Sequence, residues 1–118
     1  MIQNEEKLDK CTPDVRTIVR ALEQEFGNVV VTSGYRSPKY NKEVGGVSNS
    51  AHTKGTACDF QIPNVHVYKI ASWLLYNIRK YNWVGMGVNI YTQFIHIDFK
   101  PRKSTPAIWQ YSRDGKSL

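Results

Sequence analysis

Hydrophobic residues recur at helical spacing in two stretches of the chain. In residues 12–26 the apolar positions begin after a Thr-Pro-Asp sequence, and Gly27 follows the last of them. Thr, Pro and Asp favour the first turn of a helix, and glycine favours its end. A second apolar stripe covers residues 67–78, and Asn64 is suited to cap its first turn. The pattern therefore predicts two amphipathic helices, each with one face to bury.

Short alternating or β-branched runs predict a series of strands. These runs are Val29–Ser33, Thr56–Ile62, Trp83–Tyr91, Phe94–Phe99 and Ala107–Tyr111. Thr92-Gln93 would then be a two-residue hairpin turn between the third and fourth strands, and Pro38–Val44 would form a short helix. Helices and strands in this order predict an α+β domain with a small, mainly antiparallel sheet packed on two main helices.

Length and composition indicate a soluble globular protein. The chain has 118 residues, of which 41% are hydrophobic and 22% charged, and we expect one domain over residues 1–118. No apolar run approaches the ~20 residues of a membrane-spanning helix, so we expect no membrane insertion. Residues 1–7 lack the basic and then apolar layout of a secretory signal. We therefore expect a monomer made in the cytosol, unless a targeting segment was removed or the protein leaves the cell by another route.

The charge of the chain favours acidic partners. Its net charge of +6 suits nucleic acid, anionic lipid or an anionic cell-wall polymer. Basic residues are scattered along the chain apart from Lys100, Arg102 and Lys103. Scattered charge is typical of a solvated surface, so we expect no nucleic-acid partner.

The two cysteines, Cys11 and Cys58, are far apart in the sequence and do not form a CxxC pair. A zinc knuckle built on cysteines is therefore not expected. A disulfide between them is one option, and two buried free thiols is the interpretation that we favour.

Polar residues that can bind a metal occur on one face of two predicted strands. Asp59 alternates with Cys58 and Phe60, and His96 and Asp98 alternate with isoleucines. If the apolar faces pack on the helices, these polar groups and His52 converge on the open face of the sheet. Two imidazoles and a carboxylate are the protein ligands of a catalytic zinc, which activates a water in the fourth position.

Each of these residues also has a plainer explanation. His52 alone suits a surface loop, and Asp59 could cap a neighbouring turn. His96 and Asp98 could be a hydrogen-bonded pair on a solvated sheet face. Their recurrence on the polar faces of both strands favours the metal site.

The order of several short motifs resembles a known family. The motifs are Ser33–Pro38, Gly45-Gly46, Ser50–His52, Gly55–Phe60, Gly85–Val88 and Phe94–Asp98. Together they resemble the zinc D-alanyl-D-alanine carboxypeptidase family of peptidoglycan peptidases, which includes phage endolysins and bacterial wall endopeptidases. That family shares its zinc-site architecture with lysostaphin-type enzymes and the hedgehog signalling domain. The resemblance covers about residues 30–99, with a tryptophan near the end of the chain.

The resemblance implies a role for each matching residue. His52, Asp59 and His96 match the three ligands of a Zn²⁺ ion. Arg36 matches an arginine that binds the substrate carboxylate or the developing oxyanion, a role that suits a guanidinium. Ser50, within the same motif as the first ligand, is expected to contact the substrate.

The general base does not follow the family pattern. Many relatives have an acid three residues before the last ligand, where this chain has Gln93, and others have a histidine at the position of Phe94. Asp98 is the nearby ionisable residue, and it either accepts the proton of the water or orients His96. A shifted register, with Asp98 as the ligand and His96 beside it, is the alternative.

These observations lead to a main hypothesis and an alternative. The first is a zinc peptidase that hydrolyses a peptide bond in bacterial peptidoglycan, as a carboxypeptidase or an endopeptidase. A phage lysin, released to the cell wall from the host cytoplasm or carried on the virion, would suit the sequence. The alternative is a zinc-containing module that binds cell-wall or protein ligands without catalysis, which Gln93 and Phe94 favour. A nucleic-acid-binding domain rests on charge alone.

Overall fold

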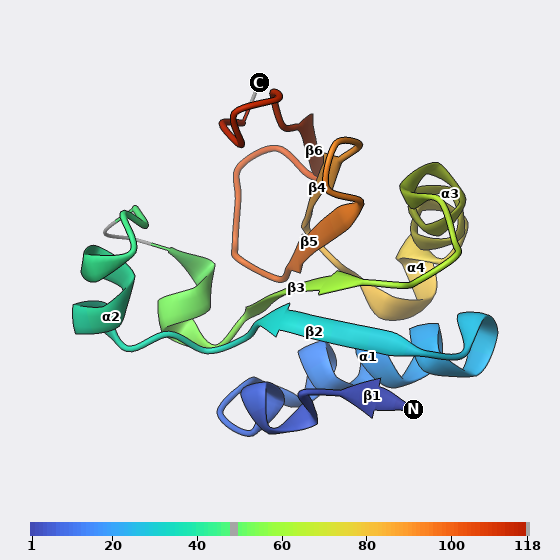
Figure 1. Ribbon diagram of the computed structural model, residues 1–118, viewed down its shortest axis with the longest axis horizontal. Coiled ribbons are helices and arrows are strands. Elements are labelled where there is room, and N and C mark those ends of the chain that lie inside the picture. The colour runs from blue at the N-terminus through green and yellow to red at the C-terminus, as the bar shows by residue number, and fades with distance from the viewer. Residues whose placement is uncertain (48–49, 118) are drawn as a thin grey trace.

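The computed structural model describes residues 1–47 and 50–117, and Figure 1 shows their arrangement. Within these residues the strands form one six-stranded sheet in the order β1-β2-β3-β5-β4-β6. The strands are β1 (Ile2–Gln3), β2 (Val29–Ser33), β3 (Ala57–Gln61), β4 (Gly85–Asn89), β5 (Phe94–Asp98) and β6 (Ala107–Gln110). The sequence pattern predicted all of these strands except β1.

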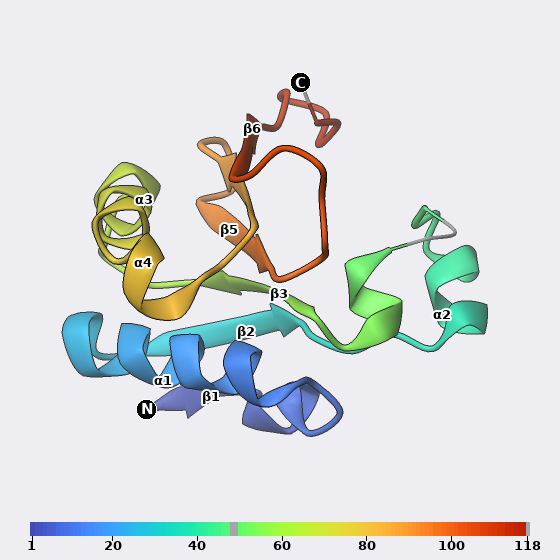
Figure 2. The same cartoon turned by 180° about the vertical axis from the view of Figure 1, so that it is seen from behind.

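The described helices are short, apart from α1 and α3. They are η1 (Glu5–Leu8), α1 (Pro13–Phe26), α2 (Pro38–Glu43), η2 (Ala51–Lys54), α3 (Val67–Tyr76) and α4 (Ile78–Tyr81), where η marks a 3-10 helix. Figures 1 and 2 show α2 and η2 at one end of the molecule, with α3 and α4 at the other. No helix in the described ranges has both the length and the apolar character needed to cross a membrane.

Helices α1 and α3 bury their apolar faces in one hydrophobic core. Val15, Ile18 and Leu22 of α1 are fully buried, and Ile70 and Leu74 of α3 join the same cluster. Strands β2 to β5 contribute the apolar residues that alternate along each of them. The two predicted amphipathic helices therefore cover the apolar face of the sheet and leave its other face free for polar groups.

The starts and ends of these helices follow the sequence signals in part. Helix α1 begins at Pro13 and ends before Gly27, whose φ of 94° suits glycine. The prediction that Asn64 caps the second helix is wrong. His66 takes that place, and its ring nitrogen accepts the backbone N–H of Tyr68. Asn64 instead has a φ of 68° in the preceding turn.

The sheet is mixed, so the prediction of a mainly antiparallel sheet is wrong. Its central pairs are antiparallel, but β1 runs parallel to β2, and β6 runs parallel to β4. Strand β1 carries too short a pattern to be predicted. Strand β6 pairs with β4 after residues 99–106 carry the chain back across the end of the sheet, which makes it parallel to β4.

The β4–β5 hairpin has a longer connection than the two residues predicted. Its strands are joined by residues 90–93, because the side chain of Asn89 accepts the backbone N–H groups of Tyr91 and Thr92. Gln93 closes the connection with a φ of 56°. These local hydrogen bonds replace the Asn-Gly signal of a tight hairpin.

The register of the central strands aligns small residues with polar ones. On β4, Gly85 and Gly87 lie opposite Asp98 and His96 of β5. Asp59 of β3 pairs with His96 from the other side. The polar face of β5 is therefore flanked by a carboxylate on one neighbour and by two positions without side chains on the other.

Candidate metal centre

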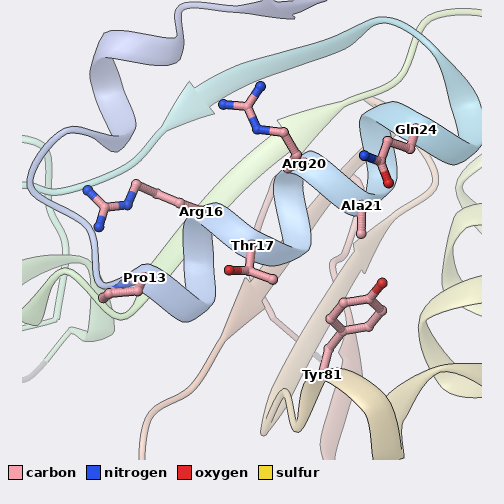
Figure 3. A pocket seen from close by; sticks show the side chains of 7 residues that line it. All are labelled: Pro13, Arg16, Thr17, Arg20, Ala21, Gln24 and Tyr81. Atoms are coloured by element: carbon pink, nitrogen blue, oxygen red, sulfur yellow. The ribbon is translucent and has the colours of Figure 1, made fainter.

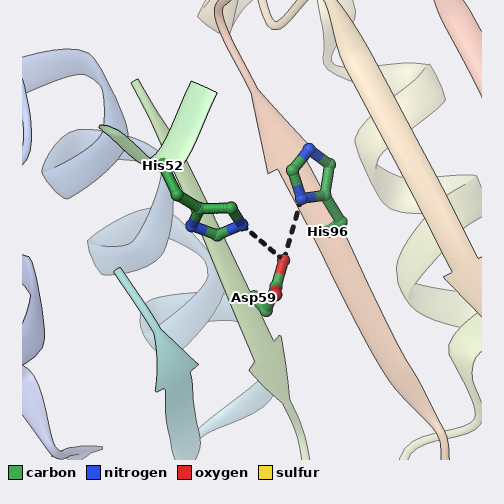
Figure 4. Close-up of side chains that lie close together, drawn as sticks. All are labelled: His52, Asp59 and His96. Atoms are coloured by element: carbon green, nitrogen blue, oxygen red, sulfur yellow. Dashed lines mark hydrogen bonds and ion pairs between the residues drawn. The ribbon is translucent and has the colours of Figure 1, made fainter. Parts of the chain in front are cut away.

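Three side chains that can bind a metal meet on the polar face of the sheet. His52 comes from η2, Asp59 from β3 and His96 from β5, and one donor atom from each lies within 4.8 Å of the others. Asp59 Oδ1 is 3.3 Å from His52 Nε2 and 2.8 Å from His96 Nδ1, as Figure 4 shows. The structure thus brings together the three predicted ligands, which are far apart in the sequence.

The local fold fixes the orientation of His52. Ser50 precedes η2, and its hydroxyl oxygen accepts the backbone N–H of His52 at 3.1 Å. His52 Nδ1 lies 2.8 Å from the carbonyl oxygen of Gly34. Because a carbonyl can only accept, Nδ1 donates to it, and Nε2 is the ring nitrogen on the side of Asp59 that is left for a cation.

His96 lies between two carboxylates. Its Nδ1 faces Asp59 Oδ1, and its Nε2 lies 2.7 Å from Asp98 Oδ2. Burial lowers the pKa of His96, but the hydrogen bonds and charges of both carboxylates outweigh it and raise the pKa to about 9. Asp98 holds a proton on Nε2, so Nδ1 is the ring nitrogen that is left for a cation.

Asp59 stays ionised between the two imidazoles. Burial raises its pKa, but the hydrogen bonds and charges of His52 and His96 outweigh burial and hold the pKa well below its usual range. Two imidazole nitrogens and one carboxylate oxygen therefore face a common point with a negative charge among them. This donor set fits Zn²⁺, whose catalytic sites have three protein ligands and an open fourth position.

A cleft of about 590 Å³ gives access to these three residues. Its remaining described lining consists of Arg36, Val44, Gly45, Gly46, Val47, Ser50, Phe94, Tyr111, Gly115, Lys116 and Ser117. The metal-ligating cluster is thus open to a substrate from the polar face. A separate groove of about 460 Å³ lies between α1 and α4, among Arg16, Arg20 and Tyr81, and contains no such cluster in the described residues (Figure 3).

Arg36 lies in the wall of the cleft, where the loop after β2 places it. Its backbone N–H donates to the carbonyl of His52 at 3.0 Å, which ties this loop to η2. Its guanidinium donates to Asn41 Oδ1 at 3.1 Å. Because a guanidinium has five N–H donors, this single bond leaves most of them for an acceptor in the cleft.

Asp98 is not in the cleft. Its side chain is 1% exposed, and it contacts His96, Arg102 and the backbone N–H of Lys100. Burial raises its pKa, but the bonds and charges of His96 and Arg102 outweigh burial and lower the pKa to about 2. Of the two roles considered for Asp98, this environment favours the orientation of His96. The cluster also contains His96 and not Asp98, against the shifted register.

Sequence reasoning gave no role in the site to three residues that lie around it. Tyr111 lines the cleft, with its ring 5.0 Å from that of Phe94, and burial raises its pKa. Trp109 lies 5.4 Å from the ring of His96, and Arg102 contacts Asp98. The alternation of Trp109 and Tyr111 on β6 was the signal in the sequence, but it became informative only once β6 was placed beside β4.

A cluster of two histidines and one aspartate in the lining of an open cleft is typical of the metal sites of zinc hydrolases. The chain belongs to the peptidase M15 family, whose model matches residues 2–98. This match confirms the resemblance to zinc D-alanyl-D-alanine carboxypeptidases and identifies the protein as a member of a zinc-dependent metallopeptidase family. A comparison with curated proteins gave no match.

Proposed function

We propose that the protein is a zinc-dependent peptidase that hydrolyses a peptide bond in bacterial peptidoglycan. The convergence of His52 Nε2, Asp59 Oδ1 and His96 Nδ1 in an open cleft carries this proposal. The peptidase M15 match supports the reaction class. The net charge of +6 suits an anionic wall, where we propose that the protein acts as a monomeric lysin, released by a phage or carried on its virion.

The three convergent atoms would hold the zinc ion. When bound there, zinc polarises the scissile carbonyl and lowers the pKa of a water. His52 is held by its bond to the carbonyl of Gly34, and His96 by its bond to Asp98. Both rings are therefore fixed with the correct nitrogen toward the metal before it binds, which reduces the reorganisation that binding requires.

Arg36 would bind negative charge in the substrate. Its guanidinium lies on the cleft wall and is oriented by Asn41, so it can grip a carboxylate or the oxygen on which charge develops. Ser50 also lines the cleft, and its hydroxyl proton is available to a substrate because its oxygen accepts the N–H of His52. A contact between Ser50 and the substrate stays a prediction.

Two roles of Asp98 can be distinguished by experiment: orientation of His96 and acceptance of the proton of the water. Its burial and its bond to His96 favour an orienting role. In that case Asp98→Asn weakens zinc binding and lowers turnover together. If Asp98 accepts the proton of the water instead, Asp98→Asn abolishes turnover and leaves zinc affinity unchanged.

A binding module without catalysis is the second candidate. The side chain of Gln93 accepts the N–H of Val67 and donates to the carbonyl of Ile90, so it ties α3 to the hairpin. Phe94 lines the cleft beside it. These two positions therefore supply no ionisable group, and among the described residues the cleft has no carboxylate other than Asp59.

Digestion of purified peptidoglycan, followed by mass spectrometry of the muropeptides, tests the proposal. We expect zinc-dependent cleavage that a chelator stops, and the products identify a carboxypeptidase or an endopeptidase. Asp59→Asn is the inactive control, and Arg36→Lys tests the anion site because lysine keeps the charge but loses the planar fork. One equivalent of bound zinc with no turnover on any wall preparation would favour the binding module.

A further inference from the structure

Four side chains form a closed ring behind the metal centre, on the side of His96 that faces away from Asp59. His96 Nε2 contacts Asp98 Oδ2 at 2.7 Å, and Arg102 contacts both oxygens of Asp98, at 2.5 and 3.1 Å. The guanidinium of Arg102 lies 5.6 Å from the Trp109 ring. The indole of Trp109 also lies 5.4 Å from the imidazole of His96, so each of the four side chains contacts two of the others.

Among these four side chains, Arg102 is the one that neutralises the negative charge of Asp98. The side chain of Asp98 is 1% exposed and that of Arg102 is 24% exposed, so a charged carboxylate is held away from water by a partly exposed cation. A planar guanidinium that donates to both carboxylate oxygens fixes the orientation of the carboxylate as well as its charge. Arg102 therefore restrains the group that restrains His96.

Strand β4 leaves space for this arrangement. A Cβ atom at Gly85 would lie 2.7 Å from Arg102 Nη1 and 2.7 Å from Asp98 Oδ2. Gly87 leaves space for Trp109, since a Cβ atom at this position would lie 2.6 Å from the indole nitrogen. Any other residue at these two positions would displace a member of the ring.

We propose that Arg102 is a positioning residue for the metal centre. It fixes the carboxylate of Asp98, which holds the Nε2 proton of His96 and so aims Nδ1 at the metal. This inference rests on the proposed zinc site. Arg102 does not appear in the lining of the cleft, so it acts through Asp98 and His96 and not on the substrate.

Zinc affinity is the direct measurement. Loss of an outer partner of a metal ligand weakens metal binding by about 10- to 100-fold, so we expect Arg102→Gln to weaken zinc binding by about tenfold in competition with a chelator. The matched control is Arg113→Gln. The guanidinium of Arg113 also lies over an aromatic side chain, 4.9 Å from the ring of Tyr91. Arg113 does not contact the four side chains behind the metal centre, so its variant should keep wild-type affinity for zinc.

A double-mutant cycle tests whether Arg102 acts through Asp98. In the Asp98→Asn background, Arg102→Gln should cause no further loss of zinc affinity, because the carboxylate that it restrains is gone. Additive losses would overturn the inference. The double variant also removes the uncompensated buried charge, so it keeps the test valid if Arg102→Gln alone does not fold.

Two further measurements separate positioning from general stabilisation. The increase in Tm that zinc causes should shrink in Arg102→Gln, whereas a purely structural role lowers Tm equally with and without zinc. Arg102→Lys should restore little, because an ammonium group cannot donate to both oxygens in one plane. The KM of the substrate should stay unchanged at saturating zinc, since Arg102 is not in the cleft.

The outcomes distinguish this inference from the proposed function. Wild-type protein that binds no zinc would overturn both. Wild-type protein that binds zinc, with Arg102→Gln binding it equally tightly, would overturn only the role of Arg102. Zinc binding without hydrolysis would overturn the peptidase proposal, and the affinity test of Arg102 would still apply.

Discussion

The two faces of strand β5 are held by different kinds of interaction. Ile95 and Ile97 on one face are fully buried in the core with Phe60 of β3. His96 and Asp98 on the other face are also largely buried, but they are held by hydrogen bonds and ion pairs to Asp59 and Arg102. Successive residues of one strand thus serve the fold and the site separately.

This difference decides what each face tolerates. Apolar contacts are non-directional, so the core accepts other side chains of similar volume. The polar face depends on which atom points where, and a buried charge without its partner costs several kcal/mol. Substitutions on the apolar face should therefore change stability, whereas substitutions on the polar face should change the affinity for zinc.

The largest effect is expected from Asp59→Asn on the polar face. It removes the ligand charge while it keeps the shape of the side chain, so zinc affinity should fall by more than the ~100-fold that an outer partner can cost. Peptidase activity should fall with it. Isothermal titration with zinc measures the loss, and unchanged affinity would contradict the assignment of Asp59 as a ligand.

Phe60→Ala changes the apolar face instead, at the residue that follows Asp59 on β3. A large cavity in the core should lower the free energy of unfolding by about 3–5 kcal/mol, measured by urea denaturation in a chelator. Phe60→Leu keeps more of the volume and should cost less. If the two faces are independent, the folded fraction of both variants binds zinc with wild-type affinity. A loss of zinc affinity would show that the two faces are energetically coupled.

Gly87→Ala should have a moderate effect on both properties. The added methyl group meets Trp109, which must shift away from His96, and overpacking of this kind costs about 1–3 kcal/mol. A change in tryptophan fluorescence together with a smaller loss of zinc affinity than in Asp59→Asn is the expected result. Wild-type fluorescence and affinity would show that β6 can move without cost.

The last effect concerns pH, which should change the stability of the metal-free protein and the affinity for zinc in opposite directions. The pKa of His96 is raised from 6.5 to about 9 in the metal-free protein, so its stabilisation is present below pH 6.5 and is lost as pH rises to 9. The free energy of unfolding in a chelator should fall by up to about 1.4 kcal/mol per pH unit. Zinc must displace this proton, so zinc affinity should rise over the same range.

Much of the fold was predictable because its signals are local. The apolar spacing after Pro13 and the run at Val29–Ser33 gave α1 and β2 with nearly correct bounds. The alternation at Asp59 and His96 predicted which face of each strand carries the polar groups. These predictions needed only side-chain periodicity within one element.

The remainder depends on contacts between distant segments. The parallel pairing of β6 with β4 puts Trp109 beside His96, and no local pattern specifies that pairing. Arg102 is close to Asp98 in sequence, but their contact requires the turn after β5 and the space at Gly85. The cluster of His52, Asp59 and His96 could therefore be predicted from motifs, whereas the places of Arg102 and Trp109 around it could not.

Cys58 directly precedes Asp59 and points to the other face of β3, into the core. Cys58 and Cys11 are both free and buried, which confirms the interpretation from the sequence, and burial raises the pKa of each thiol. Because oxidants react with the thiolate, these protonated and enclosed thiols resist oxidation. The protein should therefore keep its fold and its metal centre in oxidising and reducing surroundings alike, and can be purified without a reductant.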